Sequence, residues 1–261
     1  MFNKHQQKFC CHYVEDLNTP KAENSIRLFC FSDTHSQHDK IPKEWIHPAD
    51  IALFAGDFSN LGSFSDTQNF ISFFSSLPCT YKVMIAGNHE LTFDVERRHD
   101  IIDRFISHHP NENVDSIKQL ILESEQIIYL EDSMIELMGV KIYGSPYSPF
   151  FCNWAFPTFD QEKGSRWKKI SNECDVLLVH GPPKKILDLS TRNVHCGCPY
   201  LGKMIKKINP ALCVFGHIHE TYGLVKKGKT TFANVSTLNV RYEVTNKPMI
   251  FDLIPNAKYE K

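Results

Sequence analysis

The sequence predicts an α/β fold in one main domain, with β-sheets packed against each other and helices on the outside. Three observations indicate this class. Five short runs are apolar almost throughout, as in strands that are covered on both faces. Amphipathic helical patterns lie between these runs. Hairpin patterns occupy the later part of the chain, and they argue against a plain doubly wound parallel sheet.

The predicted buried strands are short and end in glycine or polar residues. Residues 26–32 read "IRLFCFS", and comparable apolar runs lie at 50–56, 81–87, 175–181 and 211–217. Their length is typical of strands rather than helices. We therefore expect these five segments to form the central strands of the sheets.

Three segments between the strands show helical patterns. Residues 63–77 carry apolar side chains on one face, and Ser65 with Gln68 three positions on predicts a capping box at the start. Residues 114–124 and 198–208 show the same one-sided apolar pattern. These helices would cover the outer faces of the sheets.

The later strands are predicted as hairpins. Residues 132–145 read as two strands turning at Met138-Gly139, and residues 222–236 as a hairpin with a Lys-Gly turn. Residues 247–254 form a last predicted strand.

Composition limits the class of protein and its partners. Residues 1–24 are polar and are expected to form an amino-terminal arm before a domain spanning residues 25–261. The formal net charge of -1 makes nucleic acid an unexpected partner. The 9 cysteines form no disulfide framework, and no leader or membrane-spanning run is apparent. We therefore expect a cytoplasmic protein without membrane attachment.

Polar side chains follow all five of the buried strand patterns. They are acids, amides and imidazoles: Asp33, His35, Asp57, Asn88, His89, Glu90, His180, His217 and His219. Taken singly, each has an ordinary explanation, such as an Asx turn at Asp33 or a satisfied core histidine at His180. In α/β folds, however, functional sites gather at the carboxyl ends of strands. The coincidence therefore predicts a shared site.

The chemistry of this set favours a metal centre. Without His89 and Glu90 it contains carboxylate or amide oxygens and imidazoles, which suit two divalent ions better than one tetrahedral zinc. No cysteine belongs to the set, so a thiolate zinc site is disfavoured. Two divalent ions are a known device for displacement at phosphate esters.

The motifs resemble those of the calcineurin-like metallophosphoesterase superfamily. Its pattern of D-x-H, G-D, G-N-H-[DE], H and G-H-x-H appears here in that order. Longer stretches, such as "IAGNHELTFD" and "VFGHIHETYG", are similar to the metallophosphoesterase-domain phosphodiesterases, a brain-type group related to class III cyclic nucleotide phosphodiesterases. The resemblance implies a four-layer sandwich, with two mixed β-sheets packed together and flanked by helices.

The resemblance also implies a role for each residue at the strand ends. The first metal would be bound by Asp33, His35 and His219. The second metal would be bound by Asn88, His180 and His217. Asp57 would bridge the two metals. His89 would stay off the metals and protonate the leaving oxygen or stabilise developing charge. Glu90 would support the site through a hydrogen bond, for example by orienting an imidazole. Some relatives carry glycine in place of His217, so the histidine here favours a complete second site.

The implied activity is dinuclear-metal-dependent phosphodiester hydrolysis by a metal-bridging hydroxide. Small nucleotide-like or cyclic nucleotide diesters would be the substrates, and Mn, Fe, Zn or Mg could fill the sites. Two alternatives remain open, a phosphomonoesterase similar to protein phosphatases and a nucleotide-binding scaffold with weak turnover. The sequence predicts no oligomeric state.

Two further segments have competing interpretations. "HCGC" at 195–198 offers metal-binding residue types, but its spacing fits no common zinc finger, so packing is the preferred interpretation. The aromatic loop at 145–156 could stack a nucleobase, although we expect most of its rings to serve packing.

Overall fold

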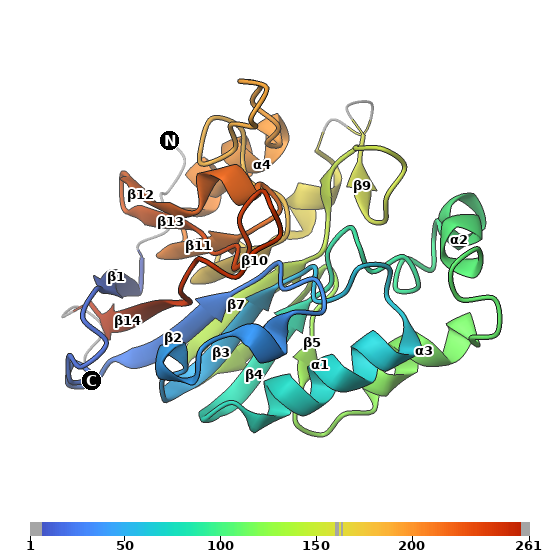
Figure 1. Cartoon of the computed structure of the whole chain (residues 1–261). Coiled ribbons are helices and arrows are strands. Elements are labelled where there is room, and N and C mark those ends of the chain that lie inside the picture. The colour runs from blue at the N-terminus through green and yellow to red at the C-terminus, as the bar shows by residue number, and fades with distance from the viewer. Residues whose placement is uncertain (1–6, 160–161, 163, 257–261) are drawn as a thin grey trace.

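The computed structural model describes residues 7–159, 162 and 164–256, whose arrangement is shown in Figure 1. Within them the chain forms two six-stranded sheets, ordered β1-β14-β2-β3-β4-β5 and β12-β13-β11-β10-β7-β6, and a small sheet of β8 and β9. The strands are β1 Phe9–Val14, β2 Ile26–Phe31, β3 Ala49–Ala55, β4 Cys79–Ile85, β5 Ile128–Tyr129, β6 Ser133–Leu137, β7 Val140–Ser145, β8 Ser148–Pro149, β9 Pro157–Thr158, β10 Val176–Val179, β11 Leu212–Phe215, β12 Gly223–Lys227, β13 Thr230–Asn234 and β14 Met249–Pro255. The α-helices are α1 Phe64–Ser76, α2 Arg98–Ile106, α3 Val114–Leu122 and α4 Pro199–Ile208.

Alternate residues of the central strands face two different cores. Leu28 and Leu53 of the first sheet pack in one cluster with Val214 of the second, so this core lies between the sheets. Phe31 faces the other way and packs against Phe74 of α1, with 6.0 Å between their ring centroids. Figure 1 shows α1 and α3 along the first sheet and α4 beside the second. The layers are therefore helix, sheet, sheet and helix.

Both sheets mix parallel and antiparallel strands. In the first, β2 to β5 run parallel, and β14 pairs antiparallel with β2 on one side and with β1 on the other. In the second, β7, β10, β11 and β13 run parallel, and hairpins add β6 and β12 at the edges. Met138 (φ 50°) and Gly139 (φ 79°) turn the first hairpin, and Gly228 (φ 64°) turns the second. The predicted fold, two mixed sheets packed together and flanked by helices, is confirmed.

The helices differ from the predictions at two points. The capping box predicted at Ser65 and Gln68 is wrong, because Ser63 has the extended backbone of a cap and its side chain accepts a hydrogen bond from the amide of Asp66 at 3.1 Å. Helix α2 has no counterpart among the predicted helices. It buries only Ile101 and Phe105, so its apolar pattern is weak in sequence.

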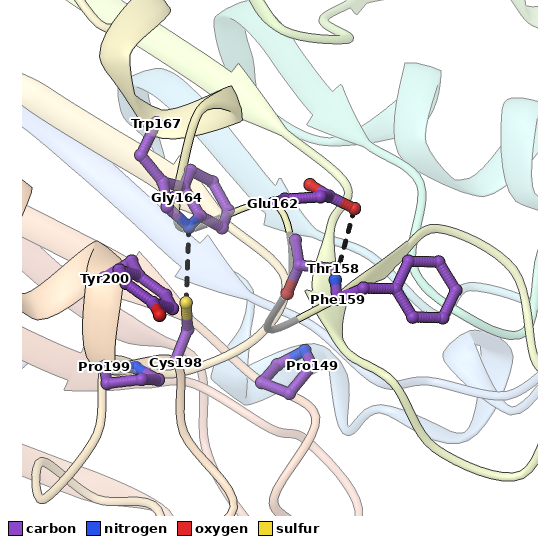
Figure 2. Close-up of a pocket in the computed structure, with 9 residues that line it drawn as sticks. All are labelled: Pro149, Thr158, Phe159, Glu162, Gly164, Trp167, Cys198, Pro199 and Tyr200. Carbon is purple, nitrogen blue, oxygen red and sulfur yellow. Dashed lines mark hydrogen bonds between the residues drawn. The ribbon is translucent and has the colours of Figure 1, made fainter.

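The first turn of α4 shows what Cys198 does. Its sulfur accepts a hydrogen bond from the indole of Trp167 at 3.2 Å, as Figure 2 shows, and another from the amide of Leu201 at 3.5 Å. The cavity drawn in Figure 2 has a volume of about 30 Å³, which suits bound water but not a substrate. Cys198 therefore caps and packs α4, in agreement with the packing interpretation for this residue.

Residues 9–14 differ from the arm that the sequence predicts. They form β1, which pairs with β14 at the edge of the first sheet. Phe9 and Cys11 face the core between the sheets and are 3% and 7% exposed, whereas His12 faces solvent. An alternating pattern over only 6 residues is a weak signal for a strand. The partner strand lies at the other end of the chain, so pairing depends on the tertiary structure.

Candidate metal centre

The carboxyl ends of parallel strands from both sheets meet at one place. Strands β2, β3 and β4 of the first sheet, and β10 and β11 of the second, are followed by the seven predicted ligands: Asp33, His35, Asp57, Asn88, His180, His217 and His219. Residues from the two sheets come within ion-pair distance of each other, since His180 Nε2 of the second sheet lies 3.3 Å from Asp57 Oδ2 of the first. The structure therefore brings all seven together.

Sharp turns at the strand ends present these side chains. Asp33, His35, Asp57 and His217 all have positive φ, between 40° and 69°, which is uncommon for residues other than glycine. Such conformations cost of order 1–3 kcal/mol each and tend to cluster at functional sites. The surrounding packing must hold the four residues in place.

Glycine is required where the backbone passes close to the ligands. A Cβ atom on Gly87 would lie 2.3 Å from Asp57 Oδ1. One on Gly216 would lie 1.9 Å from Asp33 Oδ2. Any side chain at either position would displace a predicted ligand.

Among the residues that the structure describes, three groups of side chains bring potential ligand atoms within 4.8 Å of one another. They are Asp33, His35 and His219; Asp57, His180 and His217; and His35, Asp57 and His89. Asp57 Oδ2 also lies 3.8 Å from His35 Nε2, so Asp57 faces both predicted sets. Asn88 joins the second set, because its Oδ1 lies 2.9 Å from His180 Nε2. Two of the groups follow the sets that the resemblance implies, while the third places His89 beside His35 and Asp57. The individual roles remain predictions.

Backbone carbonyls orient two of the imidazoles. The Nδ1 of His180 lies 2.9 Å from the carbonyl oxygen of Ala55, and the Nδ1 of His219 lies 3.2 Å from that of Asn239. An imidazole that donates through Nδ1 leaves Nε2 free for a metal ion. His219 accordingly turns its Nε2 to within 3.4 Å of Asp33 Oδ1.

The protonation chemistry of the cluster fits divalent ions. Both ring nitrogens of His35 are buried without a hydrogen-bond partner in the described part of the chain, and a metal ion would satisfy one of them. Burial lowers the pKa of His35 and of His217 to about 3, which keeps both imidazoles in the neutral, ligating form. Burial opposes ionisation of Asp33, but its hydrogen bond and charge interaction with His219 lower its pKa to about 2.

The pair of His180 and Asp57 shows where positive charge is favoured. Burial lowers the pKa of His180, yet the carboxylate of Asp57 outweighs it and raises that pKa to about 9. The pair therefore stabilises a cation at this position, where a divalent ion would take the place of the proton.

Comparison with known proteins agrees with this geometry. A family model described as calcineurin-like phosphoesterase matches residues 26–221, most of the chain. The chain belongs to the calcineurin-like phosphoesterase family.

The relatives of this phosphoesterase support the assignment. Metallophosphoesterase domain-containing protein 1 of Homo sapiens and that of Mus musculus are each 36% identical to it over 266 residues, covering 97% of this chain and 80% of the relative. The fold resembles that of Phosphopantetheinyl Hydrolase (PptH) from Mycobacterium tuberculosis, with a TM-score of 0.52 at 14% identity, covering 92% of this chain and 100% of that one. It also resembles TT1561 of Thermus thermophilus, with a TM-score of 0.50 at 14% identity, covering 85% and 99%.

Family and site together support a metal-dependent phosphoesterase. Within the described residues, no helix has the length and apolar character needed to cross a membrane.

His89 of the phosphoesterase is held on several sides. Its amide donates to Asp57 Oδ1 at 2.9 Å, and its Nδ1 lies 2.9 Å from the carbonyl oxygen of Asn60. The ring stacks on Trp154 with 4.1 Å between centroids and 24° between planes, and it meets the His35 ring edge-on at 4.5 Å. These contacts fix the ring and leave its Nε2 as the nitrogen available to a substrate.

Glu90 contacts other groups than the imidazole suggested by the resemblance. Its buried carboxylate accepts hydrogen bonds from the amides of Asp57, Gly87 and Ser59 and from the Ser59 hydroxyl, at 2.7–3.0 Å. Burial, followed by the nearby charge of Asp57, raises its pKa to about 8, while the four donors favour the ionised form. Glu90 therefore ties together the two loops that carry Asp57 and Asn88.

A cavity of about 670 Å³ opens beside the cluster. At one end it is lined by predicted site residues: His35, Asp57, Asn88, His89, His217 and His219. Aromatic and aliphatic side chains line much of the rest: Phe150, Phe151, Trp154, Val194, Ile218, Val240 and Tyr242. A volume of this size accommodates a small organic ligand.

Most rings of the aromatic loop serve packing. The indole of Trp154 already contacts two protein groups: it stacks on His89, and the guanidinium of Arg104 lies 4.2 Å from its ring centroid. Phe150 stacks on Phe159 at 5.4 Å. Phe151 is 60% exposed and lines the cavity, so it is the ring of this loop best placed to meet a ligand.

Sequence reasoning missed two contributors to the cavity. Tyr242 lies in a loop without a regular pattern, and its ring reaches His35 at 4.9 Å and His219 at 5.4 Å. His195 belongs to the segment interpreted as packing, yet it lines the same cavity. Neither position carries a local signal, because both reach the site through loops.

Proposed function

We propose that this phosphoesterase is a dinuclear-metal-dependent phosphodiesterase that hydrolyses small nucleotide-like or cyclic nucleotide diesters. The observation that carries the proposal is the cavity of about 670 Å³, which joins the ligand cluster to aromatic and aliphatic walls. A phosphodiester with an organic group on each oxygen suits such a site, because its phosphoryl group can reach the cluster while an organic group contacts the walls.

The residues present would hold two ions. Asp33, His35 and His219 would bind one and Asn88, His180 and His217 the other, with Asp57 shared. Bound there, Mn, Fe, Zn or Mg would polarise the phosphoryl oxygens and lower the pKa of a bound water molecule. The mixed nitrogen and oxygen ligands do not select one of these metals.

The side chains perform the remaining steps. His89 faces the cavity through Nε2, and from that atom it gives a proton to the leaving oxygen of the ester. Asn60 and Trp154 hold its ring in the orientation that this transfer needs. Glu90 keeps the loops of Asp57 and Asn88 in register, so it acts on the reaction only through their positions.

Hydrolysis of two chromogenic esters tests the proposal. Manganese-loaded protein should hydrolyse bis-p-nitrophenyl phosphate, and Asp57→Ala or His89→Ala should abolish most of this turnover. His108→Ala, an exposed histidine outside the cavity, is the matched control and should behave as wild type. A panel of 2′,3′- and 3′,5′-cyclic nucleotides then identifies the natural diester class.

Two results would overturn the proposal. Faster hydrolysis of p-nitrophenyl phosphate than of the diester would point to a phosphomonoesterase. Tight binding of nucleotides without any turnover that depends on Asp57 would point to a nucleotide-binding scaffold.

A further inference from the structure

The loop between β10 and α4 is organised around one buried acid. Asp188 is 1% exposed, and its Oδ2 accepts hydrogen bonds from the amides of Lys185 at 2.9 Å and Gly197 at 3.0 Å. Its other oxygen, Oδ1, lies 2.7 Å from Nδ1 of His195. The carboxylate therefore closes the loop and holds the imidazole in one orientation.

This contact defines the free nitrogen of His195. An ionised carboxylate only accepts hydrogen bonds, so the proton of the imidazole stays on Nδ1. Nε2 lies on the other side of the ring, and no described residue forms a hydrogen bond with it. The side chain is 43% exposed and lines the cavity of about 670 Å³ that is also lined by predicted metal ligands. A ligand in the cavity can therefore meet this atom.

The loop is also fastened to the segment that carries a predicted metal ligand. The amide of Thr191 donates to Glu220 Oε1 at 2.9 Å, and the hydroxyl of Thr221 donates to the carbonyl of Leu187 at 2.7 Å. Glu220 and Thr221 directly follow His219. His195 is thus held in a fixed position relative to the metal centre.

We infer that His195 determines specificity by forming a hydrogen bond through Nε2 with the nucleoside part of the substrate, and that Asp188 positions it. The inference rests on the proposed function and deepens it. Apolar Val194 and Val240 and polar Ser190, Thr191 and Glu220 line the same cavity as His195. On such a mixed wall, an imidazole nitrogen held in one orientation selects for a polar group on the ligand. A sugar hydroxyl such as the 3′-hydroxyl of thymidine suits both protonation states of the ring, because it donates to neutral Nε2 and accepts from the protonated form.

The competing, structural explanation is that the hydrogen bond between Asp188 and His195 only stabilises the loop. Two substitutions separate the explanations. The amide nitrogen of Asn occupies nearly the place of Nδ1, so His195→Asn can keep the bond to Asp188 but cannot reach the ligand. The amide of Gln extends to the place of Nε2, so His195→Gln can reach the ligand but loses Asp188.

The test compares two esters with the same leaving group. Bis-p-nitrophenyl phosphate lacks a nucleoside, whereas p-nitrophenyl thymidine 5′-phosphate carries one. In His195→Asn, kcat/KM for the thymidine ester should fall about tenfold more than for the simple diester, mainly through KM. His195→Gln should recover part of this preference. His99→Asn, on the exposed surface of α2, should leave both substrates unchanged.

Calorimetry provides a readout that does not depend on turnover. Thymidine 5′-monophosphate should bind metal-loaded His195→Asn about tenfold more weakly than wild type, with His195→Gln in between. The structural explanation predicts the reverse order of affinities, because only His195→Gln loses the hydrogen bond to Asp188 that stabilises the loop.

Each outcome decides one question. If His195→Asn keeps the wild-type preference and affinity, the inference is wrong. If wild type cleaves the simple diester but neither cleaves the thymidine ester nor binds thymidine 5′-monophosphate, the inference also fails, although a phosphodiesterase remains. If neither ester is cleaved, the proposed function fails, and the calorimetry alone decides the role of His195.

Discussion

At the scale of single residues, the segment 87–90 assigns different contacts to neighbouring side chains. Gly87 lets the backbone pass against Asp57, and Asn88 turns its amide oxygen toward His180. His89 stacks on an indole, and the buried carboxylate of Glu90 binds backbone amides. Consecutive residues can differ in this way because the turn after β4 points each side chain in another direction.

The contacts of Asn88 and His89 predict different losses. Asn88→Ala should lower the metal content of the purified protein, because it removes the predicted oxygen ligand from the second set. His89→Ala should keep the metal and reduce kcat by about 100-fold or more, the usual range for removing a general acid. Metal analysis together with kcat for a diester checks this. Equal metal loss in both variants would show that His89 is itself a ligand.

The contacts of Glu90 predict a loss of stability. In Glu90→Gln, the amide NH₂ would face backbone N–H donors in a buried place, so the free energy of unfolding should fall by about 1–3 kcal/mol. Urea unfolding in EDTA measures this without a contribution from metal. Glu125→Gln, at an exposed position, is the control. An unchanged unfolding free energy for Glu90→Gln would argue against the tie between the two loops.

At the scale of elements, strand β1 joins the beginning of the chain to its end. It pairs with β14 over its whole length, and it covers apolar residues that would otherwise lie at the edge of the core. The polar composition around residues 9–14 hides this contribution.

The pairing predicts a large change in the free energy of unfolding at one position of β1 and a small change at another. Phe9→Ala should lower the free energy of unfolding by about 3 kcal/mol, because it opens a cavity beneath a side chain that is 3% exposed. His12→Ala, on the solvent face of the same strand, should change it by less than about 0.5 kcal/mol. Urea unfolding of both variants checks this. Similar small effects at both positions would show that residues 9–14 behave as a loose arm in solution.

At the scale of the whole molecule, the candidate metal centre lies between the two sheets. The first sheet supplies the carboxylates, His35 and Asn88, and the second supplies His180, His217 and His219. Neither sheet has a complete ligand set. Metal binding should therefore stabilise the folded protein as a unit.

Metal removal should lower the thermal stability. With the metal at a hundredfold excess over its Kd, binding adds about 2.7 kcal/mol, so EDTA should lower Tm by roughly 5 °C or more. Asp57→Asn should lose most of this shift, since Asp57 faces both sets. Asp103→Asn, at an exposed position on α2, should retain it. A Tm that does not respond to manganese or EDTA would contradict a metal centre between the sheets.

The central strands, the two hairpins and the set of residues that meet at the strand ends could be predicted from the amino-acid sequence. These features follow from local signals: an apolar run predicts a buried strand, and Asp33 or His217 stands directly after one. Parallel strands then place such residues at a common edge. The resemblance to a family supplied the division into two metal sets, which spacing alone does not provide.

Features that depend on partners distant in sequence become visible only in the folded structure. Strand β1 forms because β14 offers it an edge, and Glu90 binds amides that only the folded loops present. The indole of Trp154 packs against His89 and Arg104. The imidazole of His195 is oriented by its hydrogen bond with Asp188. A side chain's contacts are set by the segments packed around it, so its residue type and local pattern cannot reveal them.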